Sequence, residues 1–376
     1  MIVIFYGTSA ELIKLLGVTR GVPRDQQLLI CTAQQKAQIE QFHTQSGINP
    51  DIYLARGWRG RDVLNMLEML GFMIKVHGNF IKHYQHIKRS YKKSNILNNN
   101  KTIAIVHGDT LTTVVGAYFG LLLGLRVSHI EAGMRSGKLF QPFPEEIDRK
   151  IVAKLARVHF APNNIAVSNL HKEHARGDII DTKYNTAKDA VELADKFTSD
   201  LLLRLKLPKH FGLISIHRTE LLERKKELSD FLNVVNRYAD KSHQIVFLDH
   251  ATTKEKIKVY GLDDLLEKEG IARIPKLAFM DFIQVVKKAD FILTDSGGLQ
   301  QDAYFLGTPT LIHRSVTETN EGIGANIVLS ELKLEILEDF LKNQTKKVKN
   351  KKIGDKTSPS KLIIEYLSNK GYLVSS

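Results

Sequence analysis

Short runs of apolar and β-branched residues alternate with helix-like segments along the first half of the chain, and the alternation restarts in the second half. This rhythm predicts parallel strands joined by crossover helices, because a helix-length segment separates each strand from the next. In the first half we expect strands at residues 2–6, 27–31, 52–54, 102–106, 126–130 and, as the last, 159–162. In the second half we expect strands at residues 212–217, 244–248, 291–295 and 310–312. The sequence therefore predicts an α/β fold with two Rossmann-like, doubly wound domains that face a cleft.

Length and cysteine content fit two domains in a reducing compartment. The 376 residues are 43% hydrophobic, which is enough for two cores. We expect a first domain over residues 1–166, joined by a C-terminal helix at 359–376, and a second domain over 167–358. Cys31 is the only cysteine, which excludes disulfides within the chain and Cys-rich zinc sites. The first residues read as a strand rather than a secretion signal, and the apolar run 114–125 is too short to span a bilayer, so we expect a cytoplasmic protein.

The chain carries a net charge of +13, and part of this excess is local. Residues 71–101 and 342–352 contain many lysines and no acid. One interpretation is an anionic partner such as membrane lipid or nucleic acid, and the other is two solvated basic faces. Apolar residues recur at helical spacing in the first segment and predict an amphipathic surface helix: Met73, Phe80, Tyr84, Ile87 and Tyr91. No nucleic-acid motif accompanies them, so we expect no nucleic-acid partner and only weak contact with an anionic membrane surface.

Three acidic residues of the first domain follow predicted strands or begin a predicted helix. Asp109 follows the strand 102–106 through a His-Gly turn, and Glu131 directly follows the strand 126–130. Glu145 lies at the start of the next predicted helix. The carboxyl ends of parallel strands meet at one edge of a sheet, where open α/β proteins bind their ligands. We therefore predict a proton-transfer site built from these three acids.

A glycine-rich turn in the second domain has the features of a phosphate site. The strand 291–295 is followed by Ser296, Gly297 and Gly298 and then by a predicted helix. Paired glycines let the backbone approach a phosphate, and the free N–H groups of a helix N-terminus donate to it. Ser296 can cap the helix, and Asp302 lies one to two turns in, where a carboxylate can accept from two ribose hydroxyls. The GxGxxG fingerprint is absent, which argues against a dinucleotide cofactor.

Two histidines end strands of the same predicted sheet. His217 and Arg218 close the strand 212–217, and His250 follows the strand 244–248. A histidine at a strand end is often a satisfied structural hydrogen-bonding group. The neighbouring arginine favours a functional interpretation, because a departing pyrophosphate needs cations and an acid that protonates it. We therefore include His217, Arg218 and His250 among the candidate site residues.

An ordered series of motifs runs over nearly the whole chain. Its positions are Gly7-Thr8 with Glu11 and Lys14, the turn 107–110, the segment 131–137, Pro144-Glu145-Glu146 with Arg149, Asn185-Thr186 with Asp189-Ala190, His217-Arg218, the segment 294–300, and Arg314 with Thr317, Glu318 and Glu321. This series resembles the non-hydrolysing UDP-N-acetylglucosamine 2-epimerases. The resemblance implies a glycosyltransferase-B-type fold, a uridine diphosphate site mostly in the second domain, no metal or nicotinamide cofactor, and a homodimer.

The same resemblance implies roles for individual residues. It places Asp109, Glu131 and Glu145 in acid–base roles, with Arg149 and His217 at the diphosphate. The remaining binding positions are Ser296, Gly297 and Gly298 for phosphate, Asp302 for ribose where the family has Glu, and Glu318 for the nucleotide sugar.

Two family arginines are missing. Ser9 and Thr319 stand at their positions, and losing each arginine weakens nucleotide binding by roughly 1–3 kcal/mol unless another cation replaces it. We expect Lys14, Arg135 or Arg56 to compensate, and we count Lys14 and Arg135 as candidate substrate-binding residues.

Two further departures concern regulation and the acidic site. Gln35 replaces a histidine of the activating substrate site of bacterial members, which argues against activation by substrate. Asp148 stands where the family usually has Asn.

Inversion at C2 of the sugar fits these residue types. The C2 hydrogen is not acidic, so the anomeric C–O bond breaks first, UDP leaves, a carboxylate removes the C2 proton to give a glycal, and the reverse steps deliver a proton to the opposite face. Our first hypothesis is therefore the interconversion of UDP-N-acetylglucosamine and UDP-N-acetylmannosamine for polysaccharide precursors. The alternative is a glycosyltransferase of the same fold with a nucleotide-sugar donor and a membrane-associated acceptor. A third hypothesis is a nucleotide-sugar sensor that binds UDP without turnover.

Overall fold

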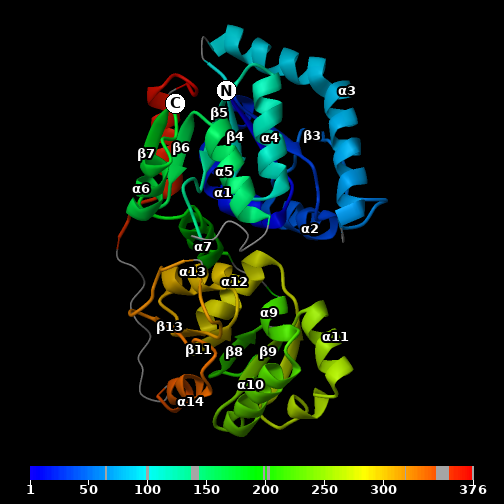
Figure 1. The fold of residues 1–376 in the computed structure, drawn as a ribbon, viewed down its shortest axis with the longest axis vertical. Coiled ribbons are helices and arrows are strands. Elements are labelled where there is room, and N and C mark those ends of the chain that lie inside the picture. Colours follow the sequence, from blue (N-terminus) through cyan, green and yellow to red (C-terminus); the bar gives the residue numbers. More distant parts are fainter. Residues whose placement is uncertain are drawn as a thin grey trace. The chain divides into compact units, whose positions relative to one another are not determined.

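The computed structural model describes residues 1–63, 66–98, 101–136, 144–197, 200, 204–317, 319–343 and 355–374. The chain divides into two compact units, one of residues 1–190 with 356–376 and one of residues 191–355 (Figure 1). The division falls after Ala190, later than the boundary expected after residue 166, because a further strand pairs with the first sheet.

The first unit contains a seven-stranded parallel sheet with the order β3-β2-β1-β4-β5-β6-β7. Its strands are β1 (Ile2–Tyr6), β2 (Gln27–Cys31), β3 (Ile52–Tyr53), β4 (Ile103–His107), β5 (Arg126–Ile130), β6 (Val158–Ala161) and β7 (Asp178–Asp181). The chain first runs outward from β1 to β3 and then returns to place β4 beside β1. The switch point of this doubly wound sheet therefore lies between β1 and β4, and ligands of such sheets bind at the carboxyl edge at this point.

Strand β7 corrects the expectation that the strand at residues 159–162 is the last of the first sheet. It pairs with β6 in parallel, from the Val158–Asp178 pair to the Ala161–Asp181 pair. All four of its residues are only partly buried, whereas the residues of β6 are buried. An edge strand of this kind lacks the buried apolar run that marks the other strands in the sequence.

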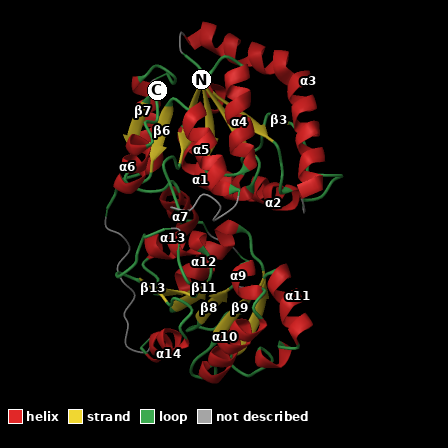
Figure 2. Cartoon of the chain, in the orientation of Figure 1, coloured by secondary structure: helices red, strands yellow, loops and turns green. Residues whose placement is uncertain are grey.

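Helices flank this sheet, and close packing accounts for two glycines of the helix after β4 (Figure 2). The helices are α1 (Ser9–Gly21), α2 (Lys36–Ser46), α3 (Met66–Asn98), α4 (Leu111–Leu122), α5 (Glu145–Leu155) and α6 (Asn164–Lys172), and the boundary between the two units falls within α7 (Ala187–Asp195). A Cβ atom at Gly116 would lie 2.6 Å from the Cβ of Phe5, and one at Gly120 would lie 2.7 Å from the Cβ of Ala104. Helix α4 can therefore lie directly on β1 and β4, and its N-terminus is fixed at the switch point.

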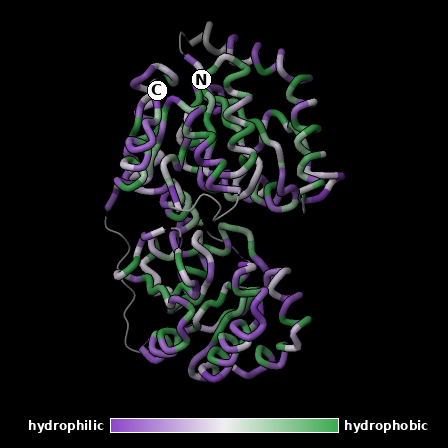
Figure 3. Tube along the Cα trace, viewed as in Figure 1, coloured by the Kyte–Doolittle hydropathy of each residue, from purple (hydrophilic) through white to green (hydrophobic). Residues whose placement is uncertain are grey.

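The basic segment forms the amphipathic surface helix that the sequence predicts. Phe72, Phe80 and Tyr91 of α3 are buried, and the ring of Phe80 stacks on that of Phe119 in α4 with centroids 3.8 Å apart. Hydrophilic and hydrophobic residues alternate along this helix (Figure 3). Neither α3 nor any other helix in the described ranges is long and apolar enough to cross a membrane.

The C-terminal helix α15 (Pro359–Asn369) packs against α1 of the first unit. A Cβ atom at Gly17 would lie 2.3 Å from the Oγ of Ser360, which shows how closely the two helices approach. The backbone N–H of Ser360 also donates to the carboxylate of Asp189 at 2.7 Å. The end of the chain is therefore part of the first unit.

The second unit contains a six-stranded parallel sheet with the order β10-β9-β8-β11-β12-β13. Its strands are β8 (Gly212–Ser215), β9 (Ile245–Asp249), β10 (Ile271–Pro275), β11 (Phe291–Thr294), β12 (Thr310–Ile312) and β13 (Ile327–Leu329). Its helices are α9 (Thr219–Leu222), α10 (Lys225–Tyr238), α11 (Ala251–Tyr260), α12 (Phe279–Lys288), α13 (Gly297–Leu306) and α14 (Leu334–Lys342). The edge strands β10 and β13 were not predicted, and β8, β9, β11 and β12 lie where the sequence indicated. The unit is again doubly wound, with β8 and β11 at its switch point.

Candidate active site

The turn between β4 and α4 carries Asp109 to the carboxyl edge of the first sheet. Gly108 adopts the left-handed conformation, with φ of 72°, that lets the chain turn sharply after His107. The Nε2 of His129 on β5 donates to the carbonyl of Gly108 at 2.7 Å and fixes this turn from the neighbouring strand. Thr110 then caps α4 by accepting a hydrogen bond from the first turn of the helix. The backbone around Asp109 is therefore held on both sides.

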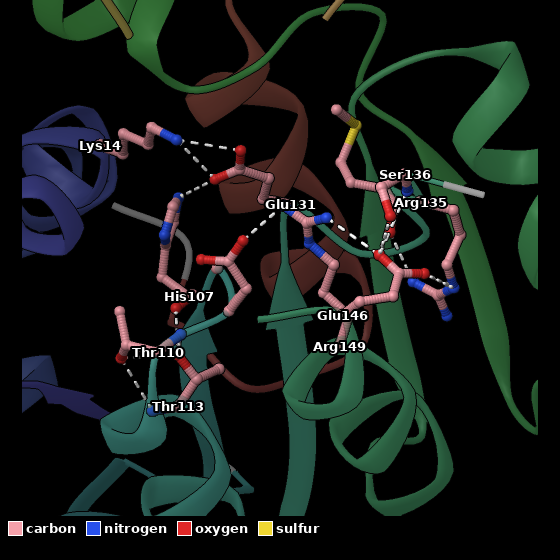
Figure 4. A network of polar contacts seen from close by, with 12 residues as sticks. Lys14, His107, Thr110, Thr113, Glu131, Arg135, Ser136, Glu146 and Arg149 are labelled. Atoms are coloured by element: carbon pink, nitrogen blue, oxygen red, sulfur yellow. Dashed lines mark hydrogen bonds and ion pairs between the residues drawn. The ribbon is translucent and has the colours of Figure 1, made fainter. Parts of the chain in front are cut away.

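Glu131 follows β5 and forms the centre of a buried ion-pair network (Figure 4). Its φ of 68° is unusual for a residue with a side chain, and such strained residues cluster at functional sites. The Nζ of Lys14 on α1 donates to both carboxylate oxygens, at 2.9 and 2.8 Å, and the Nε2 of His107 lies 3.4 Å from one of them. Burial raises the pKa of Glu131, but Lys14 and His107 together outweigh it and lower the pKa to about 2. Glu131 is therefore a fixed anion at neutral pH.

Asp109 is paired with a cation from a different helix. The Nη2 of Arg149 on α5 lies 2.5 Å from the Asp109 carboxylate, and its Nη1 donates to Glu146 at 3.1 Å. Burial and the charge of Glu131 raise the pKa of Asp109 above its usual value, while Arg149 opposes them. Two neighbouring carboxylates thus have pKa values moved in opposite directions, which is the pattern of a site that uses one acid as a fixed charge and another as a proton carrier.

Arg135 is engaged by acids of its own unit rather than by the Asp109–Arg149 pair. Its Nε and Nη2 donate to the two carboxylate oxygens of Glu173 at 2.8 and 2.6 Å. The backbone N–H of Ser136 donates to Glu146 at 3.2 Å, which links this segment to α5. The structure therefore provides Arg135 with a carboxylate partner, and the expectation that it replaces a lost arginine gains no support from these contacts.

Glu145 and Asp148 lie one helical turn apart at the start of α5. Asp148 is 5% exposed, and its Oδ2 is buried without a hydrogen-bond partner among the described residues. The Oε2 of Glu145 is also buried without a hydrogen-bond partner among the described residues. Burial, followed by the charges of Asp109 and Glu145, raises the pKa of Asp148 to about 7. Sequence reasoning noted Asp148 only as a departure from the family pattern and assigned it no role.

Glu11 joins the two loops that border the site. Its carboxylate accepts hydrogen bonds from the backbone N–H groups of Gly7 and Thr8, at 2.7 and 2.9 Å, and from the hydroxyl of Thr110. It is buried, and it also accepts from the hydroxyl of Thr113 at 3.2 Å. Glu11 therefore positions the turn that carries Asp109. The signal was visible as the capping box formed by Thr8 and Glu11.

In the second unit, the ends of β8, β9 and β11 bring His217, His250 and Asp295 together. The fully buried carboxylate of Asp295 accepts from the backbone N–H groups of His217 and Arg218, at 3.0 and 2.8 Å. The rings of His217 and His250 have centroids 4.6 Å apart, and the Nε2 of His250 lies 3.0 Å from the hydroxyl of Ser215. Burial lowers the pKa of both histidines, that of His250 to about 3. Both rings are therefore neutral at pH 7 in the free protein.

Helix α13 begins beside this group. Ser296 caps it by accepting from the N–H of Leu299 at 3.3 Å. A Cβ atom at Gly298 would meet only the Oγ of Ser296, at 3.8 Å, so the fold itself does not require glycine there. Asp302 lies within α13 and is partly buried. The predicted sugar-binding residue Glu318 lies outside the described residues.

The structure thus gathers the predicted residues into one group in each unit. The first group contains Lys14, Asp109, Glu131, Glu145 and Arg149. The second contains His217, Arg218, His250, Ser296, Gly297 and Gly298. Within the described ranges, no three His, Cys, Asp or Glu side chains are arranged to hold a metal ion.

Two parallel, doubly wound sheets with polar groups at the carboxyl ends of their strands define a glycosyltransferase-B-like α/β protein, and the predicted fold class is confirmed. The sequence model of the family described as UDP-N-acetylglucosamine 2-epimerase matches residues 24–365. The chain therefore belongs to the UDP-N-acetylglucosamine 2-epimerase family, as the series of motifs indicated.

Relatives match over most of their length. A UDP-N-acetylglucosamine 2-epimerase homolog of Methanococcus maripaludis is 31% identical over 73% of this chain and 77% of its own. The UDP-N-acetylglucosamine 2-epimerase of Bacillus subtilis is 28% identical over 98% of this chain and 95% of its own. The solved structure of Methanocaldococcus jannaschii UDP-GlcNAc 2-epimerase in complex with UDP-GlcNAc and UDP is 26% identical, with a TM-score of 0.74 and coverage of 98% of this chain and 99% of that chain.

Proposed function

We propose that the protein is a UDP-N-acetylglucosamine 2-epimerase that interconverts UDP-N-acetylglucosamine and UDP-N-acetylmannosamine. The observation that carries this proposal is the group of Lys14, Asp109, Glu131 and Arg149 at the switch point of a family member. The related M. jannaschii enzyme is bound to UDP-GlcNAc and UDP, which supports the same substrate class for this chain. With a single, buried cysteine, Cys31, the protein suits the reducing cytoplasm, where we place the reaction.

The proposed reaction begins with cleavage of the bond between C1 and the UDP oxygen, and UDP leaves with the electron pair. The C2–H bond then breaks, its electrons form the C1=C2 double bond of a glycal, and the proton moves to a carboxylate. Asp109, with its raised pKa, is our candidate for this proton carrier, and Glu145 carries the proton for the opposite face. Glu131 remains ionised and stabilises the positive charge that develops at C1. Re-addition of UDP after protonation at C2 completes the inversion.

We assign UDP binding to the group in the second unit. Ser296, Gly297 and Gly298 present the N-terminus of α13 to the diphosphate, and Asp302 binds the ribose. His217, Arg218 and His250 lie at the same edge, and a bound diphosphate raises the pKa of a nearby histidine, so His217 can then protonate the leaving group. From the first unit we assign Lys14, Arg149 and Arg135 to binding of the substrate. We also assign the carboxylate of Glu318 to this role, and this residue lies outside the described residues.

Solvent deuterium tests the function directly. The protein is incubated with UDP-N-acetylglucosamine in deuterated water, and proton NMR follows the C2 position. An epimerase incorporates deuterium at C2 and produces the second epimer. A glycosyltransferase leaves C2 unlabelled and releases UDP only with an acceptor, and a sensor binds UDP without turnover, so either result contradicts the proposal.

Gly298→Ala is expected to weaken UDP binding about tenfold without lowering stability. The new methyl group has room within the protein but occupies the surface where we place the phosphate, and alanine favours the helix over glycine. Isothermal titration with UDP and urea unfolding measure the two effects. Gly78→Ala, at an exposed helical glycine with open space around it, is the matched control. A UDP affinity unchanged in Gly298→Ala contradicts a phosphate site at this turn.

We further propose that the protein is a homodimer formed through α3 and α4. Large apolar side chains lie exposed on these two helices, whose packed residues include Phe80 and Phe119. The exposed apolar side chains are Leu67 at 80% exposure, Leu70 at 58%, Ile74 at 75%, Ile81 at 73%, Tyr118 at 45%, Leu121 at 42% and Leu122 at 46%. An apolar surface of this extent is typical of an interface, and a second copy supplies a matching surface by two-fold symmetry.

Ile74→Glu is expected to convert the dimer into a monomer, because it places a charge in the centre of the apolar surface. Light scattering after size exclusion measures the mass. Val259→Glu, an equally drastic change at an exposed apolar residue of the second unit, should leave the dimer intact. A wild-type protein that is monomeric at micromolar concentration refutes the proposal. Sedimentation with anionic vesicles at low salt tests the weaker alternative, contact between the basic side chains of α3 and a membrane.

A further inference from the structure

We propose that Asp148 shares a proton with the carboxylates of Asp109 and Glu145 and thereby sets the pH dependence of the site. The inference rests on the proposed function. Asp148 lies in the first turn of α5 and is buried, with an exposure of only 5%. Its Oδ2 receives no hydrogen bond from any described residue. A buried carboxylate without donors is costly in the ionised form, so a proton is favoured at this position.

The groups that face Asp148 are acids. The charges that act on Asp148 are those of Asp109, in the turn after β4, and of Glu145, three residues earlier in the first turn of α5. The adjacent cation, Arg149, is committed to Asp109 and Glu146, at 2.5 and 3.1 Å. Among the described residues, both charged groups that shift the pKa of Asp148 are therefore acids.

Among the described residues, the charged groups close to α5 have acidic partners of their own. The Nε of Arg135 lies 3.9 Å from Glu146 of α5, and its guanidinium is paired with Glu173. Helix α4 has no charged side chain between residues 111 and 122. Strand β5 presents His129, whose Nε2 is bound to the Gly108 carbonyl and whose pKa burial lowers to about 3, so the ring is neutral. Arg126, at the start of β5, lies at the opposite end of the strand and is directed to Asp178.

The Oδ2 of Asp148 and the Oε2 of Glu145 are both buried without a donor among the described residues, so a proton on either acid removes a buried charge that nothing compensates at these oxygens. Interacting acids titrate as a group, so the proton belongs to the cluster rather than to one residue. Burial, Asp109 and Glu145 raise the pKa of Asp148 to about 7, and this marks the pH at which the cluster loses that proton. Asp148 acts through the neighbouring acids, so it is a positioning residue and not a catalytic one.

Asp148→Asn tests the inference, because it keeps the shape of the side chain and removes its charge. In the wild type, the rate of C2 deuterium incorporation should fall on the alkaline side with a midpoint near the pKa of about 7. The variant carries one negative charge fewer than the wild type, so its remaining acids lose their last proton at a lower pH. The midpoint should therefore move to lower pH by about one unit or more. Asp148→Glu should restore the wild-type profile, and Asp25→Asn, at an exposed aspartate, should not change it.

A second measurement needs no substrate. The pKa of Asp148 is raised in the folded state, so the unfolded chain holds fewer protons at this group between pH 4 and 7, and wild-type stability falls as the pH rises through that range. Asp148→Asn should remove this fall and exceed the wild type in stability at pH 8. If Asp148→Asn exchanges deuterium with the same midpoint as the wild type, or has the same dependence of stability on pH, the inference about Asp148 is wrong. Either result leaves the proposed function unaffected. If neither protein exchanges deuterium at any pH, the proposed function fails and the role in its pH dependence fails with it.

Discussion

Asp109→Asn is expected to lower the rate of C2 epimerisation by about a thousandfold, within the range found when a general acid or base is removed. The amide keeps an oxygen for Arg149 but cannot accept a proton from C2. The proposed UDP site lies in the second unit, so the affinity for UDP should change by no more than about threefold. Deuterium incorporation at C2 measures the chemical step, and titration with UDP measures binding.

Asp25→Asn is the matched control for this prediction. Asp25 is an exposed aspartate of the same unit, and its change should leave both the rate and the UDP affinity unaltered. A folded Asp109→Asn protein that retains more than about a tenth of the wild-type rate would falsify the role of Asp109 as proton carrier. A parallel loss of UDP binding would instead indicate that Asp109 holds the fold of the site, and its assignment as proton carrier would then lack support.

The positions of the site groups could be predicted because strand ends are visible in the sequence. A buried apolar run followed by a polar residue located Asp109 and Glu131 in the first unit and His217 in the second, and parallel pairing brings such ends to one edge. The edge strand β7 escaped prediction because its residues are only partly buried and show no apolar run. Burial, which makes a strand visible in the sequence, is weakest at sheet edges.

The electrostatics of the site could not be predicted in the same way. Lys14 and Glu131 are 117 residues apart, and only the packing of α1 on the sheet brings them within 2.8 Å. The guanidinium of Arg135 is bound to the carboxylate of Glu173, and no sequence rule connects these two residues. The pKa values of Glu131 and Asp148 move in opposite directions because Glu131 is paired with Lys14, whereas the charges that act on Asp148 are those of two acids. These partners depend on tertiary contacts, and so does the choice of acid for each proposed role.

Lys14→Met is expected to lower the free energy of unfolding by about 3 kcal/mol at pH 7, since it leaves Glu131 buried without its principal cation. The Lys14 and Glu131 side chains are only 23% and 16% exposed, so solvent screens their interaction weakly. Urea unfolding measures the loss. Lys36→Met is the matched control, because Lys36 pairs with Glu40 at the surface at 3.4 Å, and such a pair contributes about 0.5 kcal/mol or less.

The pKa of Glu131 determines how the effect of Lys14→Met on stability changes with pH. The folded pKa of Glu131, about 2, lies below its ordinary value of 4.5, so the ionised carboxylate stabilises the native state. This stabilisation is fully present above pH 4.5 and is lost as the pH falls through 2, where the group is protonated in both states. Lys14→Met removes the main cause of the low pKa, so the stability difference from the wild type should be largest at neutral pH and should narrow at pH 3. A difference that is small at pH 7, or that widens on acidification, contradicts the assignment of Glu131 as the fixed anion of the site.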